Sequence, residues 1–395
     1  MIFQTLDDKQ KCVGIYADGK LHFDEFPTEL TRTWGYSGSL VNSDIEYARI
    51  YVGGTPLDKN CPEELMDELS AVTKKMHAFK KSFQLAKINM RDHCVFELIP
   101  HDFLLRFCAL KNKITEAALE NTPRPENYDH LVACQKLLHK IKYQELCIDS
   151  RDCRTLFVNG ANRNQVGKLL KGSRHIDYNL FGTVTGRLTT CSDSFPILTM
   201  KKVLRSIVKP HNNWFLSLDY NGAEARTLLA LSHQPQPDQD IHEWNITHVL
   251  KDSTIPRDEA KTLFFSWLYN PDSTAIDTNY YDRQKVLDKH YKDGYVETPL
   301  NRKIKVDQRK ALNYLIQSTT ADIVLERAIV IDKFLATRES FISHIVHDEI
   351  VIDFADSDRH LIEEIRDIFS NTHLAKFMVN LQVGKNYFEL ETLNI

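Results

Sequence analysis

The sequence lacks the features that mark membrane-spanning, secreted and zinc-binding proteins. No run of about 18 or more apolar residues occurs, so we expect no transmembrane helix and no membrane partner. The segment Met1 to Asp7 has neither the basic nor the apolar stretch of a secretory leader, and we expect a cytoplasmic protein without a targeting signal. The cysteines form no C-x-x-C pair, so we expect free thiols in a reducing compartment.

The chain also lacks the overall positive charge of a simple nucleic-acid coat protein, because its net charge is −4. The charge is nevertheless uneven along the chain. Between residues 162 and 210, nine Lys and Arg residues are opposed only by Asp177 and Asp193. Such a segment can follow a phosphate backbone or can be an ordinary solvated basic face, and both interpretations stay open.

The 395 residues suffice for two or three domains of a soluble globular protein. We expect residues 1–60 to form a small β-rich segment of unknown role, because glycines punctuate short strand-like runs there. Residues 61–175 are expected to be mainly helical, since apolar residues recur at helical spacing near 62–85, 101–121 and 127–146. Strands, turns and helices mix from 176 to 395, and the chain as a whole predicts an α+β fold.

Two acidic positions far apart in the chain each end or interrupt an apolar, strand-like run. Asp219 follows residues 214–218, and Asp348 and Glu349 lie within residues 345–352, which read as a β-hairpin with His347, Asp348 and Glu349 at its tip. Two negative charges ~4 Å apart repel by about 4 kcal/mol at an effective dielectric near 20. A fold that brings these acids together therefore needs divalent cations, and two such ions form the clamp used in phosphoryl transfer.

Two helices carry further polar patterns. Arg257, Lys261, Phe265 and Tyr269 recur every four residues after Pro256, so they share one broad helical face that suits a triphosphate and a base. The alternative is an ordinary amphipathic helix with a basic end. A second stripe follows on a long helix from about residue 306 and consists of Arg309, Asn313 and Gln317. It can contact a nucleic-acid minor groove or can simply face solvent.

Glu224 lies five residues after Asp219, in the first turn of a helix that follows the turn signal Asn221-Gly222. An acid at that position is also explained by the helix dipole.

These elements, in this order, resemble a family A DNA polymerase. The resemblance covers about residues 176–395 and is carried by residues 214–226, 257–269 and 345–352, with further matches at 185–189, 240–242, 294–298, 317–323 and 383–387. It implies a right-hand polymerase with an antiparallel-sheet palm, helical fingers at about 243–310 and a helical thumb at 61–175.

The resemblance also implies roles for single residues. Asp219 and Asp348 would hold two magnesium ions, with Glu349 as an accessory carboxylate. Nucleotide binding would fall to Arg257, Lys261, Phe265, Tyr269, Glu224 and His242, of which Glu224 would exclude a ribose 2′-hydroxyl. Primer or template DNA would contact Arg187, Arg309, Asn313, Gln317 and His347. The implied activity is addition of deoxynucleoside triphosphates to a primer 3′-hydroxyl on a template, with release of pyrophosphate, in DNA replication or repair.

The sequence departs from the family pattern at several points. The usual Ser-Gln-Ile after Asp-Tyr is replaced by Asn221-Gly222-Ala223, which predicts a looser pocket beside Glu224. Asp44 and Glu46 have the spacing of an exonuclease motif but no matching downstream acids, so we expect no proofreading exonuclease. This compactness suits a phage or mobile element whose exonuclease, helicase or processivity factor is a separate protein.

Three alternatives compete with this interpretation. A single-subunit RNA polymerase shares the paired aspartates, but Glu224 argues against it. A catalytically reduced DNA-binding protein would not need Asp219, Asp348, Arg257 and Lys261 together. A metal-dependent phosphohydrolase built on His101-Asp102 lacks a second His-Asp pair with suitable flanks.

Overall fold

A computed structural model describes residues 1–9, 12–23, 25–38, 40, 44–90, 93–151 and 153–394. The chain forms two compact units, Met1–Gln135 and Lys136–Ile395, and the boundary lies inside helix α5 (Tyr128–Lys142). This division differs from the expected boundaries at residues 60 and 175, because the N-terminal strands pack onto the helices that follow them. Among the residues described, no helix combines the length and the apolar composition that a bilayer crossing needs.

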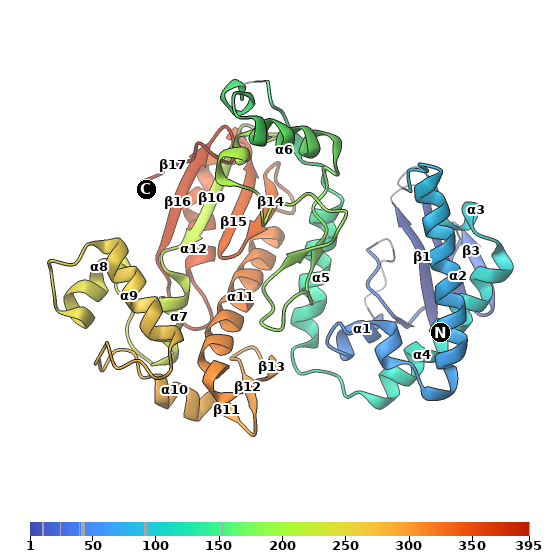
Figure 1. The fold of residues 1–395 in the computed structure, drawn as a ribbon, viewed down its shortest axis with the longest axis horizontal. Coiled ribbons are helices and arrows are strands. Elements are labelled where there is room, and N and C mark those ends of the chain that lie inside the picture. The colour runs from blue at the N-terminus through green and yellow to red at the C-terminus, as the bar shows by residue number, and fades with distance from the viewer. Residues whose placement is uncertain are drawn as a thin grey trace. The chain divides into compact units, whose positions relative to one another are not determined.

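The first unit combines an antiparallel three-stranded sheet with helices (Figure 1). Its strands and helices are β1 (Phe3–Lys9), β2 (Cys12–Ala17), β3 (Lys20–Phe23), β4 (Arg32–Thr33), β5 (Glu46–Tyr47), α1 (Ala48–Tyr51), α2 (Met66–Leu85), α3 (Val95–Leu98), α4 (His101–Asn121) and the start of α5. The amide of Gln4 on β1 donates to the hydroxyl of Thr115 on α4 at 2.9 Å, in the interior. The three helices expected from the apolar periodicity are confirmed as α2, α4 and α5, with ends shifted by up to four residues.

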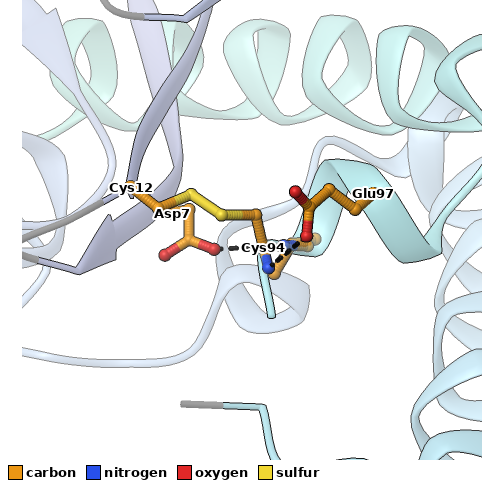
Figure 2. Close-up of a disulfide and its surroundings, with 5 residues drawn as sticks. Asp7, Cys12, Cys94 and Glu97 are labelled. Carbon is orange, nitrogen blue, oxygen red and sulfur yellow. Dashed lines mark hydrogen bonds between the residues drawn. A yellow bond between two sulfur atoms is a disulfide. The ribbon is translucent and has the colours of Figure 1, made fainter. Parts of the chain in front are cut away.

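A disulfide joins Cys12, at the start of β2, to Cys94, directly before α3 (Figure 2). The expectation of free thiols is therefore wrong for this pair, whose members lie 82 positions apart and meet only in the folded chain. Two hydrogen bonds hold the segment around Cys94. The carboxylate of Asp7 accepts from the Val95 amide at 3.0 Å, and that of Glu97 accepts from the Cys94 amide at 3.1 Å. The cysteines at 61, 108, 134, 147 and 153 are free thiols.

The second unit contains a five-stranded sheet and a group of helices beside it (Figure 1). Its elements up to the first sheet strand are β6 (Cys147–Ile148), α6 (Gly160–Lys171), β7 (Tyr178–Asn179), β8 (Thr189–Thr190), β9 (Val208–Lys209) and β10 (Trp214–Tyr220). The group beside the sheet comprises the helices α7 (Ala223–Leu231), α8 (Ile241–Asn245), α9 (Arg257–Tyr269), α10 (Arg283–His290) and α11 (Gln308–Phe334). Three short strands, β11 (Tyr291–Lys292), β12 (Tyr295–Glu297) and β13 (Lys303–Lys305), lie between α10 and α11 in the chain. The rest of the unit is β14 (Phe341–Val346), β15 (Glu349–Phe354), α12 (Ile362–Ser370), β16 (Val379–Gly384) and β17 (Glu391–Thr392).

The five-stranded sheet has the order β14-β15-β10-β16-β17, and its neighbouring strands are antiparallel. Its strands β10, β14 and β15 are buried over most of their length, which explains why apolar residues predominate in their sequences. The long helix α11 packs against β14 and β15, and α12 packs beside it against β10 and β16. The sheet thereby has a fixed register on both sides of β10.

The helices α7, α9 and α10 form a second core around the N-terminal half of α11. Phe264 and Trp267 of α9 are buried there, together with Tyr281. Arg283 closes the end of α9, because its guanidinium donates to the carbonyl oxygens of Trp267 at 2.8 Å and Asn270 at 3.0 Å. Pro256 precedes the helix as its N-cap residue rather than occupying the first helical position.

Candidate active site

The sheet brings Asp219 and Asp348 to one place. Asp219 is the sixth residue of β10 and lies opposite Glu349, the first residue of β15. His347 and Asp348 form the turn between β14 and β15, and His347 has a φ of +58°, so the turn places Asp348 beside Asp219. Both aspartates line one cavity of about 290 Å³.

The electrostatics of this pair suit a cation. Burial, together with the charges of Asp348 and Glu349, raises the pKa of Asp219 well above its ordinary value, and burial also raises the pKa of Asp348. Their ionised forms are therefore costly until positive charge reaches them. Carboxylate oxygens in a polar cavity are the ligands that hard divalent cations prefer. The two residues thus fit the magnesium ligands that the sequence predicts.

Other elements bring most of the predicted nucleotide-binding side chains to the same cavity. Those in its lining are Glu224, His242, Arg257, Lys261 and Phe265, and two predicted DNA-binding residues, Arg187 and His347, line it as well. Asn380 also lines it and was missed by the sequence analysis. It lies on β16 opposite Asp219 and donates a side-chain hydrogen bond to that carboxylate. A single amide in an irregular strand carries no signal that could have identified it.

Glu224 is held at the cavity wall by two partners. The guanidinium of Arg187 and the hydroxyl of Tyr269 donate to its two carboxylate oxygens. Burial raises the pKa of Glu224, although the charge of Arg187 opposes that shift. Glu224 therefore connects Arg187, which follows Gly186, to Tyr269, the last residue of α9.

The start of α9 is held by an acid from another helix. Arg257 donates to Asp240 at 2.6 Å, and Asp240 also caps the start of α8 by accepting from the amides of His242 and Glu243. Although Asp240 is partly buried, donors from Arg257, Asn221 and the backbone hold its pKa far below the usual range. His242 is almost fully buried, and burial lowers its pKa to about 4. The imidazole is thus neutral at physiological pH.

The expected loosening beside Glu224 is not found at Gly222. Gly222 adopts a φ of +66°, and a Cβ atom built on it would lie 2.3 Å from Ile241 and 3.3 Å from the imidazole of His242. The space left by the missing side chain is therefore filled by α8 rather than left open.

Five of the predicted site residues do not line this cavity. Tyr269, Arg309 and Asn313 line a second cavity of about 850 Å³ between α9, α10 and α11, where Arg309 pairs with Asp272 at 2.5 Å. Gln317 lies one turn further along α11. The carboxylate of Glu349 accepts from the hydroxyls of Ser217 at 2.6 Å and Tyr387 at 2.7 Å, so both of its oxygens have hydrogen-bond donors within the protein.

Comparisons with known proteins point in one direction. Residues 278–389 match the model of DNA polymerase family A. The chain is 24% identical over 274 positions to DNA polymerase I of Pseudomonas aeruginosa. The aligned segment covers 55% of this chain and 30% of that protein. Its fold is similar to the POL domain of Pol1 from M. smegmatis in complex with DNA primer-template and dNTP, with a TM-score of 0.61, 16% identity and coverage of 74% of this chain and 76% of that one.

These similarities have a defined extent. The chain spans about 30% of the length of the curated relative that it matches. The structural similarity, at 16% identity, bears on the fold of a polymerase domain. The family match covers α10, α11 and most of the C-terminal strands, and it includes Asp348 but not Asp219.

Proposed function

We propose that this chain, which carries a family A DNA polymerase domain, is a DNA-directed DNA polymerase that extends a primer on a template with deoxynucleotides. The observation that carries the proposal is the meeting of Asp219 and Asp348 with the cations of α9 in one cavity. A site for nucleotidyl transfer needs acidic side chains that bind metal ions and basic side chains that bind phosphates.

In this proposal segments of the chain take the roles of the parts of a right hand. The five-stranded sheet, with α11 and α12 against it, is the palm. Residues of about 243–310, which include α9 and α10, are the fingers, and residues 61–175 are assigned to the thumb. The support for the palm is its sheet order, since the central strand carries Asp219 and the adjacent hairpin carries Asp348.

The chemistry follows from the side chains around the cavity. Asp219 and Asp348 would hold two Mg²⁺ ions, which supply Lewis-acid stabilisation of the attacking 3′-oxygen and of the leaving pyrophosphate. Arg257 and Lys261 bind the triphosphate through charge-assisted hydrogen bonds and so orient its α-phosphate. His242, neutral and buried beside Phe265, presents an uncharged imidazole to the same phosphates.

Nucleotide choice falls to Glu224. Its carboxylate, fixed by Arg187 and Tyr269, stands at the cavity wall near the place where Phe265 would meet the sugar. A buried acid held on both oxygens cannot easily move aside for a 2′-hydroxyl, so deoxynucleotides are preferred. This argument favours a DNA polymerase over a single-subunit RNA polymerase.

The DNA contacts are assigned to Arg187 and His347 at the cavity and to Arg309, Asn313 and Gln317 along α11. The side-chain amide oxygen of Asn313 is buried and has no hydrogen-bond partner among the residues described, so a base or sugar donor that reached it would satisfy a buried acceptor. Arg309 pairs with the exposed Asp272, and a phosphate can replace that partner at little cost.

The experiment is extension of a labelled primer–template with Mg²⁺, comparing deoxynucleotides, ribonucleotides and no nucleotide. We expect extension with deoxynucleotides, and no shortening without nucleotides because no exonuclease is expected. Asp219→Asn and Asp348→Asn should each lower the extension rate by at least about 10³-fold while primer–template binding persists. Asp356→Asn is the matched control, since Asp356 is exposed and accepts from Trp214 at the far end of β10. Extension that survives either aspartate change would contradict the proposal.

A further inference from the structure

The side chain of Asn221 joins three segments of the second unit. It lies two residues after Asp219 and is 5% exposed. Its amide nitrogen donates to the carboxylate of Asp240 at 2.7 Å, and its amide oxygen accepts from the backbone of Ile241 at 2.8 Å. The same oxygen accepts from Arg226 on α7 at 3.2 Å. Donor and acceptor are both used, which an asparagine can provide and an aspartate or serine cannot at this reach.

Arg226 fixes the loop that leads to Asp240. This arginine is fully buried, and it donates to the carbonyl oxygens of Asn221 at 2.7 Å, Pro237 at 3.0 Å and Gln239 at 2.7 Å. A buried guanidinium with carbonyl partners in a low-dielectric interior allows the loop little freedom. Asp240 therefore reaches the cavity from a rigid support rather than from a mobile loop.

Asp240 connects this rigid loop to the start of α9. One of its oxygens accepts from the amides of His242 and Glu243 and so starts α8. The other oxygen accepts from both Asn221 and Arg257, at 2.7 Å and 2.6 Å. Asn221 and Arg257 thus share one acceptor atom, and the direction of the Arg257 guanidinium depends on where Asn221 holds that atom.

We propose that Asn221 is a positioning residue for the triphosphate of the incoming nucleotide, acting through Asp240 on Arg257. The inference rests on the proposed function and deepens it, because it assigns control of the phosphate-binding arginine to a residue beside the metal ligand Asp219. Gly222 belongs to the same arrangement, since a side chain there would push Ile241 and His242 away from Asn221. The departure Asn221-Gly222 from the family pattern is thereby explained as a connection to α8.

The test uses Asn221→Asp in the full chain. This change keeps the size of the side chain and its acceptor for Ile241 and Arg226, but it replaces the donor to Asp240 with a second carboxylate. We expect the KM for the deoxynucleotide to rise about tenfold, with kcat and the affinity for primer–template changed less than about threefold. Asn221→Ser, which is small and uncharged, should show the same split more weakly. Asn213→Ala at the opposite end of β10, where Asn213 accepts from the Asp356 amide, is the matched control.

A second measurement separates this inference from the proposed function. Calorimetric binding of inorganic triphosphate with Mg²⁺ needs no extension, and the variant should bind about tenfold more weakly than the wild type. In an Arg257→Lys background the Asn221→Asp change should add little, because both act on the same contact.

The outcomes distinguish the role of Asn221 from the polymerase proposal. Equal nucleotide KM and equal triphosphate binding in wild type and variant would overturn the role of Asn221 while the polymerase proposal stands. A full additional loss in the Arg257→Lys background would also overturn it, since Asn221 would then not act through Arg257. A wild type that binds triphosphate but extends no primer would overturn the polymerase proposal alone. Absence of triphosphate binding by the wild type would overturn both.

Discussion

The buried ion pair between Arg302 and Asp322 allows a quantitative prediction. Asp322 of α11 is 1% exposed and the side chain of Arg302 is 11% exposed. The guanidinium donates to both carboxylate oxygens, at 2.6 and 3.2 Å, and the hydroxyl of Thr298 donates to Asp322 at 3.4 Å. Asp322→Asn removes the negative charge that faces the buried Arg302 guanidinium. Loss of one partner of a buried pair costs about 3–5 kcal/mol of unfolding free energy.

The expected effect is large in a melting experiment. For a unit of about this size each kcal/mol lowers the melting temperature by roughly 2–4 °C, so Asp322→Asn should lower it by roughly 6–20 °C. Asp332→Asn is the matched control on the same helix. Asp332 pairs with Lys140 at 2.5 Å, but the side chain of Lys140 is 45% exposed, and such a surface pair contributes about 0–1 kcal/mol.

The same variant should also disturb the cavity. Gly186 has a φ of +75°, and a Cβ atom on it would lie 2.6 Å from the guanidinium of Arg302. The guanidinium therefore packs directly against Gly186, the residue that precedes Arg187. Calorimetry and chemical denaturation of both variants measure the melting temperature and the free energy of unfolding. Equal melting temperatures for Asp322→Asn and Asp332→Asn would refute the reasoning, because burial would then not distinguish the two pairs.

Three further predictions concern single side chains. Glu224→Ala should raise the use of ribonucleotides relative to deoxynucleotides by at least about tenfold in single-nucleotide incorporation, and unchanged selectivity would remove Glu224 from that role. Burial lowers the pKa of His344 from 6.5 to about 3, so the unfolded chain binds one more proton between these values. Stability should therefore fall as the pH drops below 6.5, by up to about 1.4 kcal/mol per pH unit from this group, and His344→Phe should flatten that dependence in acid denaturation. Gly222→Ala should cost about 1–3 kcal/mol in chemical denaturation, through its positive φ and the contact with Ile241, and a neutral result would mean that α8 yields easily.

Sequence patterns predicted the local elements of the site well. The strand Trp214–Tyr220 was expected because its apolar run is continuous, and α9 begins and ends at Arg257 and Tyr269 because Pro256 and Asn270 mark its limits. The hairpin was predicted with Glu349 at its tip, whereas this residue begins β15. A two-residue turn with His347 at positive φ is not readable from the residue types, since only a few per cent of non-glycine residues adopt that conformation, although histidine is enriched among them.

Contacts between distant segments could not be predicted in the same way. The pairing of Cys12 with Cys94 and the hydrogen bond from Asn221 to Asp240 depend on where loops of irregular structure lead the chain. Glu349 looked like a free acid because its partner Tyr387 lies 38 residues further on. Such partners follow from tertiary packing, which overrides any local pattern.

The central position of β10 has a consequence for synthesis of the protein. Tyr220 ends this strand, and β16, which pairs along its other edge, begins only at Val379. While the ribosome makes the residues between them, this edge of the apolar strand stays unpaired and can capture another nascent chain. A chain ended before Val379 would keep both aspartates and still expose that edge, so premature termination should yield insoluble and inactive protein rather than a smaller active one.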